Sequence, residues 1–288
     1  MQEVAANVFI ETGYPGVTLG AVVSARGMTL LDAPFRTEDV RSWRAALSNL
    51  MGSGERLLVN LDAHHDRTLG ARAMECTVIG HENMAQVFRT RSAMFKPQNA
   101  ETGAEWESHA SLGSIRWAPP DITFNQRMQI HGDEAEGISM LLEHCPGPSS
   151  GAIWALLPDA GVVFVGDAVV LDQPPFLANA DLSAWVELLE RLLAEPYQSM
   201  LLVSGRGGLI ARSQVQAQLS WLQKVRKMVA EFAEQKEAAE MVMQLADGLL
   251  QDFEPINERE QLFRNRLRWG LYQYYLRKYR PSSVEVEE

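Results

Sequence analysis

The sequence predicts an α/β protein with two mixed sheets that carry helices on their outer faces, followed by an all-helical C-terminal part. The order of the segments supports this prediction, because β-prone runs come first, then runs that alternate with helical periodicity, then β-prone runs again. Strand signals stop beyond Ser213, and apolar residues then recur at helical spacing. We therefore expect one domain over residues 1–212 and a helical extension over residues 213–288.

The first third of the chain is typical of antiparallel strands followed by alternating helices and strands. Turn residues such as Gly13, Pro15 and Gly27 separate the opening β-prone runs, which indicates consecutive antiparallel strands. A helix is expected from Thr37 to Met51, because an acidic first turn follows Thr37 and apolar residues recur at helical spacing. The expected strands are 7–10, 17–23, 28–31, 56–61 and 76–79, with helical stretches after residue 66 and over 83–94.

The remainder of the expected domain contains a long loop and a second group of strands. Residues 96–120 show weak periodicity and several glycines and prolines, which is typical of a loop or lid. The expected strands are 122–130, 137–143, 152–157, 162–165 and 200–203, with a helix over 182–193. The extension is expected to form two helices up to Pro255 and a final helix over 257–279, in which arginines are interleaved with aromatic residues.

Composition limits the class of protein. The 26 basic and 37 acidic residues give a net charge of −11, which argues against a surface built to hold nucleic acid or an anionic membrane. The first 212 residues hold 15 basic and 25 acidic side chains, so nearly all of the negative excess lies there. Two cysteines form no disulfide framework, no apolar run is long enough for a membrane span, and the N-terminus has no signal-peptide pattern. We expect a cytoplasmic protein.

The segment with the most polar side chains lies at the end of a buried strand. Residues 59–70 read Val-Asn-Leu-Asp-Ala-His-His-Asp-Arg-Thr-Leu-Gly, and they lead from a strand into a helix. Functional sites of α/β proteins commonly lie at the carboxyl ends of strands. This segment therefore predicts a site, with Asp62, His64 and Asp66 as its candidate functional groups.

Several landmarks in the same order resemble the metallo-β-lactamase superfamily. Residues 59–70 resemble its His-x-His-x-Asp-His signature, and residues 30–34, Leu-Leu-Asp-Ala-Pro, resemble its early apolar-Asp-x-Pro turn. Residues 143–148, Glu-His-Cys-Pro-Gly-Pro, resemble its Thr-Pro-Gly-His segment. Residues 165–168, Val-Gly-Asp-Ala, and 204–207, Ser-Gly-Arg-Gly, resemble its Gly-Asp-Ala and Gly-His-Gly motifs. The resemblance implies a four-layer αββα sandwich with a C-terminal helical extension that caps the mouth of the active site.

The metal ligands that the resemblance implies are largely replaced. The residues at the first-metal positions are Asp62, His64 and Pro148; those at the second-metal positions are Asp66, Arg67 and Arg206, and Asp167 keeps the bridging position. A guanidinium cannot ligate a metal, because it stays protonated and offers no lone pair. Two buried carboxylates without a metal need positive partners, so we interpret Arg67 and Arg206 as a substitute for the second metal.

Two functional hypotheses follow. In the first, Asp62, His64 and Asp167 hold a single Zn²⁺, Mn²⁺ or Fe²⁺, and Asp66 orients or deprotonates a water that attacks an ester, thioester, lactone or similar bond. In the second, the protein holds no metal and is not catalytic, and Arg67 and Arg206 bind an anionic small molecule.

The basic, aromatic final helix also has two interpretations. Arginines and tyrosines of this kind occur on nucleic-acid surfaces, but the strongly negative first 212 residues favour docking of the helix on the domain or on a second subunit. We therefore expect either a capping extension or a homodimer formed through the C-terminal helices.

Overall fold

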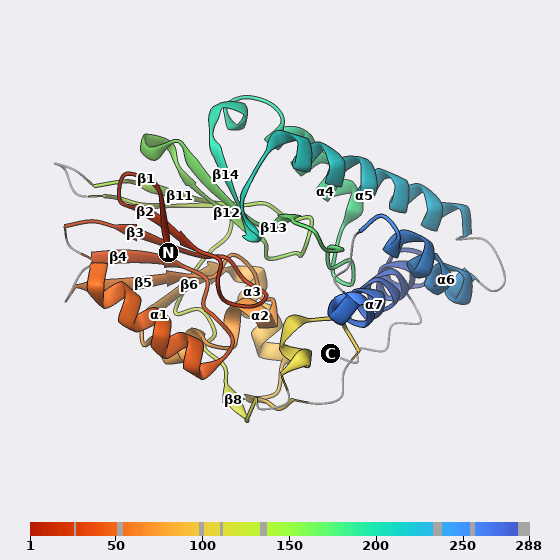
Figure 1. The fold of residues 1–288 in the computed structure, drawn as a ribbon, viewed down its shortest axis with the longest axis horizontal. Helices are drawn as coiled ribbons and strands as arrows, with labels where there is room; N and C mark the ends of the chain where they lie inside the picture. Colours follow the sequence, from red (N-terminus) through yellow and green to blue (C-terminus); the bar gives the residue numbers. More distant parts are fainter. Residues whose placement is uncertain are drawn as a thin grey trace.

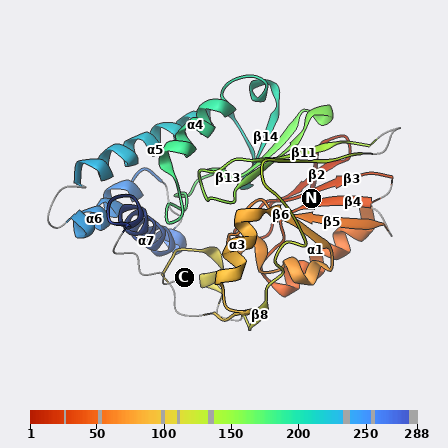
Figure 2. The ribbon, with the colours of Figure 1, turned by 180° about the vertical axis from the view of Figure 1, so that it is seen from behind.

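Two sheets lie face to face and helices cover their outer sides (Figure 1). The structure, a computed structural model, describes residues 1–25, 27–50, 54–97, 101–109, 112–132, 137–232, 238–253 and 257–281. The view from behind shows the same layers, with α6 and α7 beside the sheets (Figure 2). The predicted α/β architecture of two mixed sheets is therefore confirmed.

The first sheet has the strand order β1-β2-β3-β4-β5-β6-β9. Its strands are β1 (Gln2–Ala5), β2 (Val8–Glu11), β3 (Leu19–Val23), β4 (Gly27–Leu31), β5 (Glu55–Val59), β6 (Thr77–His81) and β9 (Ile122–Phe124). The first four form an antiparallel meander, of which the turn residues predicted β2, β3 and β4, and β4, β5, β6 and β9 run parallel. Parallel neighbours need crossover connections, which contain α1 (Thr37–Leu50), the one-turn α2 (His65–Thr68) and α3 (Glu82–Thr90).

The second sheet has the strand order β10-β11-β12-β13-β14-β15. Its strands are β10 (Arg127–Ile130), β11 (Met140–His144), β12 (Ile153–Leu157), β13 (Val162–Val170), β14 (Leu201–Arg206) and β15 (Gly208–Ile210). Of these strands, β13 and β14 run parallel, and α4 (Leu182–Leu192) lies in the connection between them. A small separate ribbon pairs β7 (Met94–Phe95) with β8 (Ile115–Arg116).

Three clusters of buried apolar side chains define the four layers. Between the sheets, residues such as Val59 and Ile79 of the first sheet share a core with Phe164 and Val203 of the second. A second core lies between the first sheet and α1, where Trp43 is fully buried. The third and largest lies on the other face of the second sheet. Each sheet therefore buries both of its faces, which explains why its strands read as continuous apolar runs.

The C-terminal helices pack against that largest core. They are α5 (Arg212–Phe232), α6 (Ala238–Leu250) and α7 (Glu260–Tyr279), and their buried residues include Val215, Leu249, Leu267 and Leu271. No described helix is long and apolar enough to cross a membrane. The division into domains at residues 212 and 213, the cytoplasmic location and the homodimer stay predictions.

The structure corrects the sequence-based elements at several points. The expected strand 122–130 is two strands, β9 in the first sheet and β10 in the second, and Asn125 and Gln126 join them. A continuous β-prone run does not mark where a chain crosses between sheets, so this division was not predictable from periodicity. Short β1, β15, β7 and β8 were also missed, and the expected helix over 83–94 ends at Thr90. Met51 and Pro255 lie outside the described residues.

The packing of α7 predicts a large effect of Leu267→Ala. Leu267 is fully buried in the cluster that α7 shares with the second sheet, so truncation should cost about 2–5 kcal/mol of unfolding free energy. Leu209→Ala is the control, because that side chain on β15 is 39% exposed and its loss should cost about 0.5 kcal/mol or less. Urea unfolding followed by circular dichroism measures both. Equal small costs would contradict the observed docking of α7.

Candidate functional site

The candidate site lies where the carboxyl ends of parallel strands from both sheets meet. Asp32 follows β4, and residues 60–66 follow β5. Asp167 lies in β13 directly after Gly166, where the pairing with β14 shifts register, and Arg206 is the last residue of β14. Such an irregularity re-aims a side chain, and Gly166 adopts the left-handed backbone conformation (φ 56°) that glycine accommodates most easily.

Arg67 lies at the centre of this group and is 0% exposed. Its NH1 donates to Asp32 Oδ2 at 2.6 Å, and its NH2 donates to Asp167 Oδ1. Its Nε lies 3.0 Å from Asp62 Oδ1, an ion-pair contact without the alignment of a hydrogen bond. One guanidinium thus contacts three buried carboxylates from three different segments.

A second buried arginine, Arg206, belongs to the same group of charged side chains. Its Nε lies 3.1 Å from both oxygens of Asp167, and its NH1 donates to Asp66 Oδ2 at 2.9 Å. Its NH2 lies 3.0 Å from His64 Nδ1, which must accept because a guanidinium only donates. Asp167 therefore joins the two guanidinium groups, and the arginines form one continuous ion-pair network.

Gly205 makes room for Arg67. A Cβ atom at position 205 would lie 2.9 Å from both NH1 and NH2 of Arg67 and 2.8 Å from the carbonyl carbon of Gly166. A side chain at this position would therefore push against the guanidinium and against backbone. The absence of a side chain at Gly205 is therefore fitted to the presence of Arg67.

Asp66 is fixed by backbone groups as well as by Arg206. Its Oδ1 accepts from Trp106 N at 3.0 Å, and its Oδ2 accepts from Glu105 N at 3.2 Å. These amides open the 3₁₀ turn η2 (Glu105–Ser108), which lies inside the loop expected over 96–120. Asp66 is 0% exposed, so its carboxylate anchors this loop and faces no open space.

The pKa values follow from burial and from these pairs. Burial raises the pKa of Asp32 to about 6, although Arg67 opposes the shift. Burial likewise raises the pKa of Asp62, whereas Arg206 and Arg67 together hold the pKa of Asp167 below its usual range. The carboxylates in turn raise the pKa of Arg67. Both arginines therefore stay charged.

The side chains expected to hold a metal do not fit one. Asp62 forms an ion pair with Arg67, and Asp167 accepts a hydrogen bond from Arg67. The Nδ1 atom of His64 accepts from the Asp66 amide at 3.3 Å and from Arg206. Burial and the neighbouring Arg206 lower the pKa of His64 well below its usual value, so the ring is neutral. Within the described part of the chain, no group of three or more His, Cys, Asp or Glu side chains is arranged to hold an ion. The donor atoms at this site are therefore engaged with protein groups rather than arranged around a metal.

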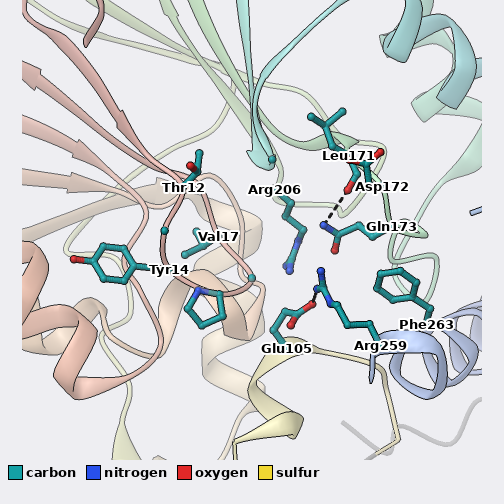
Figure 3. Close-up of a pocket in the computed structure, with 14 residues that line it drawn as sticks. Thr12, Tyr14, Val17, Glu105, Leu171, Asp172, Gln173, Arg206, Arg259 and Phe263 are labelled. Carbon is teal, nitrogen blue, oxygen red and sulfur yellow. Dashed lines mark hydrogen bonds and ion pairs between the residues drawn. The ribbon is translucent and has the colours of Figure 1, made fainter. Parts of the chain in front are cut away.

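A cavity of about 600 Å³ opens beside this network. Its wall consists of residues 12–17, Glu105, residues 171–173, Arg206, Gly207, Arg259 and Phe263. Figure 3 shows the guanidinium ends of Arg206 and Arg259 pointing toward the same space from opposite sides, with the Glu105 carboxylate beside Arg259. Arg259 comes from the turn before α7 and Phe263 from the first turn of α7, so the C-terminal part forms one side of the cavity.

A third arginine, Arg266, supports the cavity from behind. Its Nε donates to Gly103 O at 2.8 Å, and its NH1 donates to Gln173 Oε1 at 2.7 Å and to Pro174 O at 3.1 Å. Its guanidinium carbon lies 4.0 Å from the centre of the Phe176 ring. Burial lowers the pKa of Arg266 well below its usual value, with Arg206 as a further cause. Arg266 thus ties two wall segments to α7.

The structure brings all the site residues expected from sequence into one cluster: Asp62, His64, Asp66, Arg67, Asp167 and Arg206. Sequence reasoning missed Asp32, Glu105, Arg259 and Arg266 as members of the site. For Arg266 a signal existed, because it falls on the same helical face as Phe263, Leu267 and Gly270. An arginine on an otherwise apolar face is a mark of a buried ion pair or hydrogen-bond network.

Comparison with solved structures shows the fold. A metallo-β-lactamase family protein from Thermus thermophilus is 17% identical and superposes with a TM-score of 0.64 over 96% of this chain and 95% of its own. A metallo-β-lactamase from Pontibacter korlensis is 18% identical, with a TM-score of 0.58 over 77% of this chain and 97% of its own. A stereoselective inverting sec-alkylsulfatase from Pseudomonas sp. is 12% identical, with a TM-score of 0.65 over 99% of this chain and 52% of its own.

Neither a protein-family model nor a curated protein matches the sequence. The solved structures nevertheless show that the chain has the metallo-β-lactamase fold, which confirms the αββα sandwich that its motifs implied. At these identities the likeness establishes the fold alone.

The ion-pair network predicts that Arg67→Met destabilises the protein strongly. The variant leaves Asp32, Asp62 and Asp167 buried without their shared cation, so the cost should be about 3–5 kcal/mol of unfolding free energy. Lys224→Met serves as the control, because its ion pair with Asp252 is exposed and should contribute less than about 1 kcal/mol. Urea unfolding of both variants provides the comparison. A cost for Arg67→Met as small as that of the control would contradict the network.

Proposed function

We propose that this protein binds an anionic small molecule in the cavity beside Arg206 and Arg259, without a metal ion. The observation that carries the proposal is the pairing of Arg67 and Arg206 with Asp62, Asp66 and Asp167. These guanidinium groups lie at positions where the resemblance places side chains that bind a metal. A guanidinium has no lone pair to offer a metal. This favours the metal-free hypothesis over a mononuclear hydrolase of esters, thioesters or lactones.

The two arginines expected to bind the anion have different roles in the proposal. Arg67 is fully buried and its three nitrogen positions face Asp32, Asp62 and Asp167, so we assign it to the network alone. Arg206 also belongs to the network and is 2% exposed, but unlike Arg67 it lines the cavity. Its NH1 and NH2 each carry a second N–H besides the one directed at Asp66 or His64, so it can add a bond to a ligand without leaving the network. Arg259, which sequence reasoning did not single out, supplies the second cation at the wall.

The cavity suits a small molecule with one oxyanion and an apolar body. Its volume of about 600 Å³ lies inside the range of ligand pockets. Two guanidinium groups that converge on one space favour a carboxylate or phosphoryl group, which accepts hydrogen bonds from planar donor forks. Val17, Leu171 and Phe263 offer apolar surface on the same wall.

The proposal predicts that the purified protein holds no stoichiometric metal. We expect elemental analysis of protein prepared without a metal-affinity column, and incubated with Zn²⁺, Mn²⁺ and Fe²⁺ before desalting, to find none of them bound. The physical reason is that the lone pairs of Asp62, His64 and Asp167 face protein donors. About one equivalent of metal that disappears in both Asp62→Ala and His64→Ala would instead support the mononuclear hydrolase.

A second prediction concerns ligand charge. Phenyl phosphate and benzoate should raise the melting temperature, whereas the uncharged phenol and benzamide should not, because only the anions gain charge-assisted hydrogen bonds from the cavity wall. Arg259→Gln should weaken binding of both anions by about tenfold or more in titration calorimetry. The matched control is Arg41→Gln, since Arg41 is exposed on α1. Equal stabilisation by charged and uncharged members of each pair would overturn the proposal.

A further inference from the structure

Glu105 is a buried carboxylate that pairs with Arg259 at the cavity wall. Its side chain is 8% exposed, and its Oε1 pairs with Arg259 NH2 and lies 3.4 Å from Arg266 NH2. A carboxylate in this position makes the contact with Arg259 that an anionic ligand would make. Figure 3 shows it at the cavity wall, beside the end of Arg259.

The backbone of Glu105 is anchored independently of its carboxylate. The Glu105 and Trp106 amides donate to Asp66, which belongs to the buried ion-pair network. Gly16 has a positive φ of 74°, and a Cβ there would lie 2.7 Å from Glu105 Cγ, so this glycine leaves the space that the glutamate stem fills. The carboxylate can therefore change partners while its backbone stays in place.

The two arginines depend on Glu105 to different degrees. Arg266 also donates to Gly103 O, Gln173 Oε1 and Pro174 O, so its position does not depend on whether Glu105 pairs with Arg259. Arg259 has a side chain that is 37% exposed, and within the described residues its ion pair is with Glu105. Because the guanidinium of Arg259 lines the cavity and is partly exposed, an incoming oxyanion can reach it and take the place of the Glu105 carboxylate.

We propose that the Glu105 carboxylate forms an ion pair with Arg259 in the ligand-free protein and is displaced from Arg259 by the oxyanion of the ligand. This rests on the proposed function, and it adds a built-in competitor that sets the affinity of the site. The carboxylate then keeps its contact with Arg266, while Arg259 and Arg206 bind the ligand's carboxylate or phosphoryl group. The exchange swaps one ion pair for another, so no uncompensated charge is left in the wall.

The test is Glu105→Gln, measured by titration calorimetry with phenyl phosphate and, separately, benzoate. Glutamine keeps the shape of the side chain and removes the charge that competes for Arg259. We expect both probes to bind about tenfold tighter or more. Glu258→Gln is the control with the same charge change, because Glu258 is exposed and precedes Arg259 in the chain; its affinity should stay at the wild-type value.

A second pair of variants separates competition from general electrostatics. In the Arg259→Gln background, Glu105→Gln should give no gain, because the contested cation is absent. Glu105→Asp keeps the charge but has a side chain one methylene group shorter, so its carboxylate reaches Arg259 less well. This variant should also bind the probes more tightly, and it tests the proposal if Glu105→Gln does not fold.

The outcomes distinguish the two proposals. Wild-type protein that binds the anions, with Glu105→Gln or Glu105→Asp binding no tighter, would overturn the competition and leave the proposed function standing. Failure of the wild type and all Glu105 variants to bind either probe would overturn both. A gain with only one probe would identify that oxyanion, carboxylate or phosphoryl, as the class that the site selects.

Discussion

The pairing of one buried guanidinium with three carboxylates is the interaction on which the rest of the site depends. Asp32 follows β4, Asp62 follows β5 and Asp167 lies within β13, and Arg67 is the cation that holds the three together. Buried charges are costly unless each is paired and hydrogen bonded. Removing this cation would therefore affect both sheets, since β4 and β5 belong to the first and β13 to the second.

The network also determines where the loop and the C-terminal part lie. Arg206 fixes Asp66, Asp66 anchors the amides at the start of η2, and Glu105 of η2 reaches Arg259 and Arg266. A chain of charge-assisted contacts thus runs from the centre of the sandwich to α7. This chain of contacts holds Glu105 and Arg259 at the cavity wall.

Much of the fold was predictable because it depends on local patterns and ordered motifs. Buried strands on both sheets read as apolar runs, and turn residues such as Gly13 and Gly27 marked the meander. The division of residues 122–130 between two sheets was not predictable, because the crossing depends on tertiary pairing: Phe124 pairs with His81 and Arg127 with Glu143.

The site was predictable only as far as its motifs reach. Residues 62–67, Asp167 and Arg206 lie in recognisable segments, so the sequence alone could propose that they meet. Glu105 and Arg259 lie 154 positions apart in the chain, outside any motif, and only the docking of α7 brings them together. Because neither residue type is unusual for an exposed surface, no local signal distinguishes this pair from solvated charges.

The network behaves as a unit, and this limits how the site can change. Asp167 contacts both Arg67 and Arg206, so replacing either arginine alone leaves a buried carboxylate with part of its compensation lost. The substitution Arg206→His, for example, would supply one lone pair for a metal, while Arg67 would still form ion pairs with Asp62 and Asp167. Interaction energies in such coupled groups are strongly non-additive. Single substitutions toward a metal site should therefore each cost stability without creating a metal site, and only simultaneous replacement of both arginines would release the carboxylates together.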